Sequence, residues 1–246
     1  MSVNGKSKSK EIRARLSHPV IDSDGHWREY EPLAMDYLRE EAGPKLVEKW
    51  TSRVRALGQG AFAKLTKQER HDQRIGQPPW WALATPNTLD TATSFIPRLM
   101  HDRLEDMGLD FAILYPSASQ LFAPYVGDEE LRHAGCRAFN RYAAETWAEY
   151  RDRVTPIGVI PMHTPQEAIA ELEHCKSLGI KAVAMGSLIR RSIPAAEKQG
   201  VSRRFAFWVD ALGMDSDYDY DPVWRKCEEL GYPATFHSAA ENMGLR

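Results

Sequence analysis

A short polar segment near the start of the chain carries residues that could bind a metal ion. The pentapeptide DSDGH occupies residues 22–26 and closes an apolar stretch that predicts a β-strand over residues 20–24. Residues two apart in extended backbone point to the same side, so Asp24 and His26 could face one divalent cation at the carboxyl end of a parallel sheet. The same pentapeptide is also typical of an ordinary turn in which His26 caps a neighbouring group.

A second histidine has a similar position near the other end of the sequence. Residues 233–236 form a short segment typical of a buried strand, and His237 follows it directly. Because the carboxyl ends of parallel strands meet at one edge of a sheet, His26 and His237 are predicted to lie at the same edge. A hydrogen-bonded structural histidine at a strand end is the alternative for His237.

Short runs of apolar or β-branched residues predict the strands of a parallel α/β fold. They cover residues 20–24, 109–115, 154–161, 180–185 and 233–236. Amphipathic helical segments lie between them, and the repeated order of strand, helix and turn indicates right-handed βα units.

The helices between these strands are marked by their capping residues. Thr164, Pro165 and Glu167 form the signature of a capping box, and Gly179 can end that helix in the left-handed conformation. A second helix, over residues 221–231, begins with Asp-Pro and ends at a glycine in the same way. The apolar face of a third helix is formed by Leu131, Ala134, Ala138 and Tyr142.

Two segments are too long to be simple connections. Residues 27–108 form an insertion between the first two strands, and residues 187–219 separate the fourth and fifth units. An insertion of the first kind is expected to form a lid or pocket wall at one end of the sheet. Residues 1–17 are predicted to be a mobile basic tail, and residues 18–246 a single domain.

Composition excludes several classes of protein. The 32 lysine and arginine residues balance 34 acidic residues, so the net charge of −2 favours neither nucleic acid nor an anionic membrane as a partner. The longest apolar runs reach about five residues, far below the roughly 18 that span a bilayer. The widely separated Cys136, Cys175 and Cys227 indicate neither a disulfide framework nor a cysteine metal site. A cytoplasmic protein with a small-molecule substrate is expected.

Several motifs follow one another along the chain. They are VIDSDGH at residues 20–26, NTLD at 87–90 with IPRL at 96–99, RLEDMGLDFAILYP at 103–116, and PATFHS at 233–238. Together they resemble the amidohydrolase-related branch of the amidohydrolase superfamily, which includes aminocarboxymuconate-semialdehyde decarboxylase and the resorcylate decarboxylases. The resemblance covers the chain after the tail and implies a distorted (β/α)8 barrel of the TIM-barrel type with one catalytic divalent metal ion.

The resemblance also implies which residues hold that metal ion. It assigns Asp24 and His26 as the ligand pair after the first strand and His237 as the ligand after the fifth, with His237 also counted as catalytic. Zn²⁺, Mn²⁺ or Mg²⁺ could fill such a site. The acid at position 24, which some relatives share and which replaces the first histidine of the HxH version, makes Mn²⁺ and Mg²⁺ more competitive with Zn²⁺. Binuclear relatives use a carboxylated lysine at the end of the fourth strand, whereas Lys181 lies at its start, so a mononuclear site is expected.

The chain departs from the family pattern in its later strands. Only the first five βα units of the eight-stranded barrel are predicted, and three more would need roughly 90 residues. The histidine after the sixth strand and the aspartate after the eighth have no counterpart in the sequence. It therefore resembles a C-terminally truncated member with an open sheet edge, and we expect little or no turnover from residues 1–246 alone.

Candidate substrate contacts lie outside this ligand set. His163 follows the third strand, while Arg98 and His101 precede the second, and each could contact a carboxylate or an aromatic ring. Trp80 and Trp81 could form an aromatic pocket wall in the first insertion. The alternative for all five is a structural role, which for the tryptophans means anchoring the insertion to the barrel.

The expected function is that of a metal-dependent hydrolase or non-oxidative decarboxylase (carboxy-lyase) of a small carboxylated or aromatic molecule. Hydrolysis requires an activated water aimed at an electrophilic carbon. Decarboxylation requires a metal-chelated substrate and a proton delivered to the carbon that loses carbon dioxide. These residues do not separate the two reactions. The alternative is an inactive barrel fragment that acts as an interaction module, and a homo-oligomer is compatible with either.

Overall fold

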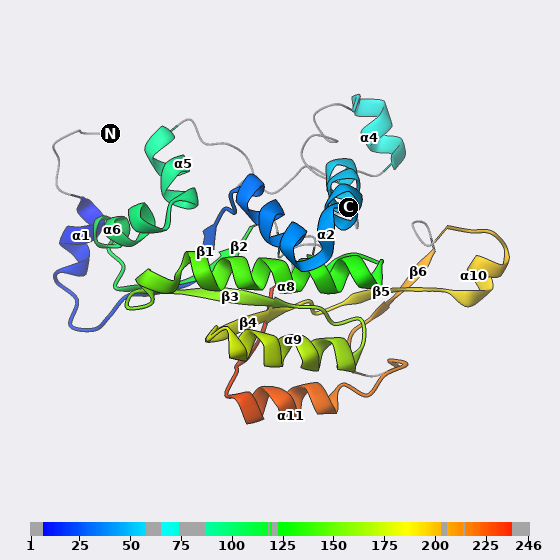
Figure 1. Ribbon diagram of the computed structural model, residues 1–246. Coiled ribbons are helices and arrows are strands. Elements are labelled where there is room, and N and C mark those ends of the chain that lie inside the picture. Colours follow the sequence, from blue (N-terminus) through cyan, green and yellow to red (C-terminus); the bar gives the residue numbers. More distant parts are fainter. Residues whose placement is uncertain are drawn as a thin grey trace.

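One parallel sheet forms the centre of the molecule. The computed structural model describes residues 7–57, 65–73, 87–117, 119, 123–202, 206–213 and 215–237. The sheet consists of β1 (Ile21–Trp27), β2 (Phe111–Pro116), β3 (Val154–Ile160), β4 (Ala182–Met185) and β7 (Ala234–Phe236), in the order β1-β2-β3-β4-β7 (Figure 1). All neighbours run parallel. The five predicted strands and the predicted partial-barrel α/β fold are confirmed.

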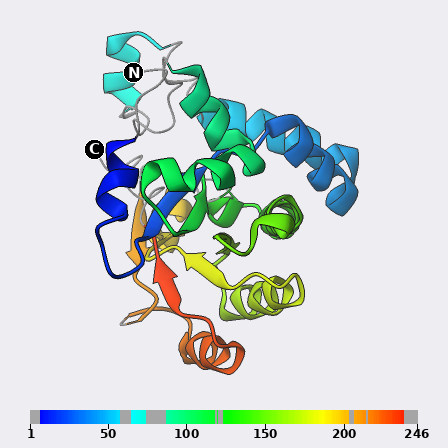
Figure 2. The ribbon, with the colours of Figure 1, turned by 90° about the vertical axis from the view of Figure 1, so that its left-hand side faces the viewer.

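Three helices cover the outer face of this sheet. They are α8 (Glu129–Thr146), α9 (Pro165–Ser177) and α11 (Asp221–Leu230), which Figure 2 shows nearly end on, one after another around the strands. Between α9, α11 and the sheet lies an apolar core that includes Leu172, Val183 and Val223. A smaller apolar cluster on the opposite face of the sheet, which we call the inner-face cluster, consists of Tyr115, Ile157, Ala182 and Ala184.

The helix ends follow the predicted capping residues. Thr164 Oγ1 accepts a hydrogen bond from Glu167 N at 3.2 Å, and Pro165 is the first residue of α9. Gly179 and Gly231, which follow α9 and α11, have φ angles of 72° and 71° and thus the predicted left-handed conformation. The Glu167 carboxylate does not complete the capping box, because it turns to Arg132 of α8.

The first insertion is helical and packs against the barrel. It contains α2 (Glu31–Leu57), α4 (Lys67–Gln73), α5 (Thr88–Phe95) and α6 (Pro97–Met107). The α2 helix kinks at Gly43, whose φ of 77° and ψ of 170° are not helical, just before Pro44. The Trp50 ring packs against Phe139 of α8, with 5.1 Å between centroids. A Cβ at Gly135 would lie 2.8 Å from that tryptophan, so the glycine permits the close packing of α2 on α8.

Residues 7–17 differ from the predicted mobile tail. Lys8–Arg13 form the short helix α1. Arg13 makes a bidentate ion pair with Asp110, and Lys10 Nζ lies 2.9 Å from Glu105 Oε1 of α6. Two of the basic residues that suggested a solvated tail, Lys10 and Arg13, therefore have acidic partners on α6 and just before β2.

The second insertion contains a hairpin that the sequence did not predict. Two antiparallel strands, β5 (Ile189–Ser192) and β6 (Phe207–Asp210), flank α10 (Pro194–Lys198). Their short, charged sequences lack the apolar alternation by which strands are recognised. Fully buried Asp210 accepts from Arg191 Nε at 2.7 Å, and Arg191 Nη1 donates to the His163 main-chain oxygen at 2.8 Å. These bonds tie the hairpin to the segment after β3.

Short 3-10 turns, η2 (Ala123–Tyr125) and η3 (Ala148–Tyr150), flank α8. All three cysteines are buried free thiols. Within the part of the chain that the structure describes, no helix combines the length and apolar character needed to cross a membrane.

A buried ion pair joins α8 to α9. Arg132 Nε and Nη2 lie 2.8 and 2.5 Å from the two carboxylate oxygens of Glu167. The two side chains are only 3% and 5% exposed. Charges removed from water to this extent are tolerated when they are paired and hydrogen-bonded, so each residue depends on the other.

Replacing Arg132 with methionine is expected to lower the free energy of unfolding by about 3–5 kcal/mol, because Glu167 is left buried without its guanidinium partner. Urea denaturation followed by circular dichroism measures the change. Arg98→Met is the control, since that side chain is 81% exposed and should change stability by less than about 0.5 kcal/mol. The double variant Arg132→Met/Glu167→Met should recover most of the loss, and an equal or larger loss would contradict the interpretation.

Glu171 of α9 should make stability depend on pH. Burial raises the pKa of this carboxyl to about 7, against the opposing effects of the Asn140 hydrogen bond and the Arg137 charge. Because the folded-state pKa is raised, the free energy of unfolding is highest below about pH 4.5 and falls as pH rises through 7, by about 3 kcal/mol for this group. Glu171→Gln should remove this decline, as urea denaturation between pH 5 and 8 would show. The control Glu173→Gln, on the same helix but exposed, should keep it.

Candidate metal centre

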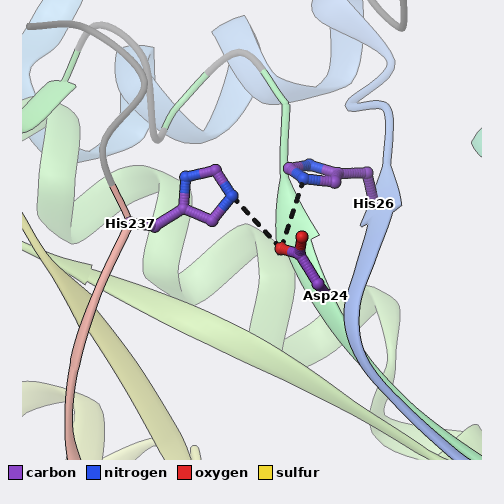
Figure 3. A group of neighbouring side chains, drawn as sticks. All are labelled: Asp24, His26 and His237. Atoms are coloured by element: carbon purple, nitrogen blue, oxygen red, sulfur yellow. Dashed lines mark ion pairs between the residues drawn. The ribbon is translucent and has the colours of Figure 1, made fainter.

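A bulge in β1 places the two candidate ligands of this strand. The strand continues past its predicted end at Asp24, and its register with β2 shifts between Asp22 and Gly25. A bulge inserts an extra residue and redirects the side chains beside it. Asp24 and His26 consequently both point toward His237, which approaches from the end of β7 (Figure 3).

These three side chains are in contact. Asp24 Oδ1 lies 3.2 Å from His237 Nε2 and 3.8 Å from His26 Nε2. The two imidazole rings are nearly perpendicular, with 5.3 Å between their centroids. Each histidine side chain is 20% exposed, whereas that of Asp24 is 72% exposed. The cluster is therefore accessible from solvent on the carboxylate side.

The contact requires a strongly curved sheet. The strands that carry the cluster, β1 and β7, are the two outermost strands of the five. Four interstrand spacings in a flat sheet would separate them by about 19 Å. Side-chain atoms at 3.2 Å can meet only if the sheet curls as the strands of a barrel do. The cluster thus lies at the mouth of the partial barrel.

The electrostatics of the cluster favour uncharged imidazole at His26. Burial is the largest cause that lowers the pKa of His26, and the charge of His237 lowers it further. Asp24 and Asp22 act in the opposite direction but do not reverse the shift. Neutral imidazole is the form that binds a metal ion, so this environment favours the form of His26 that can act as a ligand.

The donor set fits a divalent cation. One oxygen and two nitrogen atoms from the three residues all lie within 4.8 Å of one another. Ligands about 2.0–2.2 Å from a common ion are separated by at most about 4.4 Å, so a small adjustment brings all three into range. In addition, His237 Nδ1 is buried, while its Nε2 faces the carboxylate. A carboxylate with two imidazoles suits Zn²⁺ or Mn²⁺ in particular.

Tyr115 forms a wall of this site that the sequence did not identify. Its ring lies 4.8 Å from that of His237 and 5.8 Å from that of His26, measured between centroids. Tyr115 is buried near the carboxyl end of β2, two residues along from the centre of an apolar run. Its place at the end of a predicted strand was the available signal, but an aromatic residue there is equally typical of core packing.

The other predicted site residues are not brought into this cluster. Arg98 lies on α6 with an exposed side chain 3.7 Å from Asp102. His101 of the same helix lies 3.1 Å from Asp152, in the turn before β3. The main-chain oxygen of His163 is held by the hairpin, as described above. Trp80 and Trp81 lie outside the described residues.

A second group of potential ligands lies between α8 and α9. Glu129, His133 and Glu167 also offer three atoms within 4.8 Å of one another. However, both carboxylate oxygens of Glu167 already bind the Arg132 guanidinium. A cation there would lie beside a fixed positive charge, so this group is better explained by the ion pair between the helices.

The sequence profile of the amidohydrolase family matches residues 21–245. The chain therefore belongs to the amidohydrolase family, as the motifs predicted. The match covers all five strands of the partial barrel and the three residues of the cluster. No curated protein matches the chain.

Solved structures share the fold at low sequence identity. An amidohydrolase from Mycobacterium avium subsp. paratuberculosis K-10 is 19% identical with a TM-score of 0.55, over 92% of this chain and 60% of its own. The 5-carboxyvanillate decarboxylase of Novosphingobium aromaticivorans, solved with manganese and 4-hydroxy-3-methoxy-5-nitrobenzoic acid, is 16% identical with a TM-score of 0.52, over 98% and 56%. A dihydroxybenzoic acid decarboxylase from Polaromonas sp. JS666, with manganese and 2-nitroresorcinol, is 17% identical with a TM-score of 0.51, over 90% and 49%. The chain spans about half the length of these structures.

Gly25 should be essential for the geometry of β1. A Cβ at this position would lie 2.8 Å from Leu114 Cδ2 and 3.1 Å from the Ile113 main-chain oxygen. Gly25→Ala is therefore expected to force β1 away from β2 and to lower the free energy of unfolding by about 1–3 kcal/mol in urea denaturation. Gly213→Ala is the control, because among the described residues a Cβ there meets only the Ala211 oxygen, at 3.9 Å. Equal stability of the two variants would show that the strands have room for a side chain.

Proposed function

We propose that Asp24, His26 and His237 hold one divalent cation and that the protein is a metal-dependent enzyme acting on a small carboxylated aromatic molecule. The contact of these three side chains at the barrel mouth, at 3.2 and 3.8 Å from the shared carboxylate oxygen, is the observation that carries this proposal. Membership of the amidohydrolase family supports it. His237 is also proposed as catalytic, because a ligand at this position lies beside the reacting atoms.

Manganese is the proposed cation. Two of the similar solved structures contain manganese. An acid at the first ligand position is compatible with this choice, since carboxylate oxygen favours harder cations than imidazole or thiolate does. Zn²⁺ is the strongest competitor on raw affinity, and Mg²⁺ is disfavoured by two imidazole ligands.

Decarboxylation is the proposed reaction, with hydrolysis as the alternative. Both manganese-containing structures are of decarboxylases, crystallised with a nitrated hydroxybenzoic acid or a nitrated phenol. A bound divalent cation supplies Lewis-acid stabilisation of negative charge on a substrate oxygen. The Tyr115 ring beside His237 offers an apolar surface for an aromatic ring, and the exposed side of Asp24 leaves the site open for substrate entry.

Binding of one equivalent of Mn²⁺ is the first test. Isothermal titration calorimetry and elemental analysis of the purified chain should give one site per molecule. His26→Ala and His237→Ala should each weaken Mn²⁺ binding by at least about tenfold. Loss of a group that merely orients a metal ligand already lowers metal affinity about tenfold to hundredfold, and loss of the ligand itself should cost no less. His101→Ala is the matched control, since in the described structure that imidazole contacts Asp102, Asp152 and the Tyr150 ring and lies outside the cluster.

The reaction needs a separate measurement. Manganese-dependent release of carbon dioxide from 2,6-dihydroxybenzoate or 5-carboxyvanillate would support decarboxylation, whereas hydrolysis of an amide or lactone would support the alternative. Metal binding that His26→Ala and His237→Ala leave unchanged would overturn the proposed site.

An interaction module is the second candidate function. Ile21 of β1 and Phe236 of β7, on the two outermost strands, are 56% and 50% exposed. Apolar side chains on sheet edges favour association with another polypeptide. A metal-free oligomer in size-exclusion chromatography would favour this function, and a monomer with one equivalent of manganese would favour the enzyme.

A further inference from the structure

The end of β4 contacts a tyrosine from the turn η2. Gly186 directly follows Met185, the last residue of β4. A Cβ at Gly186 would lie 2.6 Å from the hydroxyl oxygen of Tyr125 and 2.8 Å from its Cε1. Non-bonded carbon atoms do not approach this closely, so the phenol occupies the space that a side chain at position 186 would need.

The space beside Gly186 belongs to the inner face of the sheet. Ala182 and Ala184 of β4 are part of the inner-face cluster, whereas Val183 and Met185 pack in the core under the outer helices. Because side chains alternate along a strand, position 186 faces inward as Ala184 does. The Tyr125 phenol that fills this space therefore lies on the inner side.

His237 faces the same side on the neighbouring strand. Its backbone N donates to the Met185 oxygen at 3.3 Å, which places His237 beside the β4 end. The preceding Phe236 packs against Trp224 of the outer helix α11, with 6.0 Å between ring centroids. By alternation His237 turns inward, where its ring meets Tyr115 of the inner-face cluster. Tyr125 and His237 thus lie beside the ends of the neighbouring strands β4 and β7, at the same mouth of the partial barrel.

We propose that the Tyr125 hydroxyl is a substrate contact that donates a hydrogen bond to an oxygen of the metal-bound carboxylated aromatic molecule. Gly186 is then a specificity-determining position, because the absence of its side chain makes room for the phenol. This assignment rests on the proposed metal-dependent function and adds to it a residue outside the ligand set. The hydroxyl supplies a neutral donor on the side of the mouth formed by β4.

The chemistry of a phenol suits this role. A tyrosine hydroxyl is protonated at neutral pH and can donate to an anionic oxygen without adding charge to the site. Hydrogen bonds to a charged acceptor are roughly twice as strong as neutral ones. Tyr125 is partly exposed rather than sealed in the core, as a residue that meets an entering molecule has to be.

Binding of salicylate to the manganese-loaded chain tests this assignment, because the adjacent phenol and carboxylate of salicylate can chelate one divalent ion. Quenching of salicylate fluorescence gives the dissociation constant. Tyr125→Phe is expected to weaken salicylate binding about tenfold, the effect of losing one hydrogen bond to a charged group, and to leave Mn²⁺ affinity unchanged. Gly186→Ala should weaken binding at least as much, since its Cβ displaces the phenol.

Two control variants carry the same chemical changes elsewhere. Tyr150→Phe removes a hydroxyl from η3, before β3 begins and thus near the opposite end of the strands. Gly213→Ala adds a methyl group where, within the described part of the chain, the nearest atom is the Ala211 oxygen at 3.9 Å. Both should bind salicylate as the unmodified chain does. Thermal denaturation monitored for every variant checks that the fold is kept, and Tyr125→Phe decides the question if Gly186→Ala does not fold.

The outcomes separate this assignment from the proposed function. If the unmodified chain binds Mn²⁺ and then salicylate, but Tyr125→Phe binds salicylate equally well, the role of Tyr125 is overturned and the metal site stands. Equal weakening in Tyr150→Phe would overturn it as well. If the manganese-loaded unmodified chain does not bind salicylate, the proposed substrate class and the role of Tyr125 fail together.

Discussion

The curvature of the parallel sheet is the constraint on which the candidate site depends. Asp24 and His26 belong to one outermost strand and His237 follows the other, so the cluster has no counterpart in a flat sheet of the same strands. Its 3.2 Å contact exists because the strands coil around the inner-face cluster of tyrosine, isoleucine and two alanines. On this inner face, β4 carries the small Ala182 and Ala184, whereas β2 and β3 carry the larger Tyr115 and Ile157, so the side chains become smaller toward β4. The helices α8, α9 and α11 pack on the outer face of the sheet and stabilise this curvature.

The curvature alone would not direct the side chains of Asp24 and His26 toward His237. The bulge in β1 provides this orientation. In a regular strand, Asp22, Asp24 and His26 would all fall on one face. The extra residue between Asp22 and Gly25 breaks this series and lets β1 extend beyond the polar segment. Asp22 Oδ1 then accepts from the Asp24 backbone N at 3.0 Å, so the first acid supports the loop of the bulge while the second faces the histidines.

The sequence predicted the parts of the structure that depend on local chemistry. Capping residues located α9 and α11 because a helix end needs local partners for its free backbone groups, and these stand next to it in the chain. The meeting of His26 with His237 was also predictable, since parallel strands end at one edge whatever their length. The ordered contacts of Arg13 were not, because Asp110 lies 97 positions away and only the folded chain brings them together.

The unpredicted features share a dependence on distant partners. The β5–β6 hairpin is held by one buried carboxylate, Asp210, whose partner Arg191 also reaches the segment after β3. Four-residue strands of mixed polarity carry no sequence pattern that indicates such a bond. The bulge is similar, since it appears only in the register against β2.

The inner side of the barrel mouth is therefore built largely by backbone geometry and by glycine. Gly25 lets β1 approach β2 beside the cluster, and Gly186 leaves space at the end of β4 for an aromatic ring from η2. Both act by lacking a Cβ, at φ angles that other residues can adopt, so neither position is strained. Their importance follows from what a methyl group would strike, namely the Leu114 side chain of β2 in one case and the Tyr125 phenol in the other. A glycine of this kind has no local sequence signature, which is why the meeting of the polar side chains at this mouth could be predicted while the space between them could not.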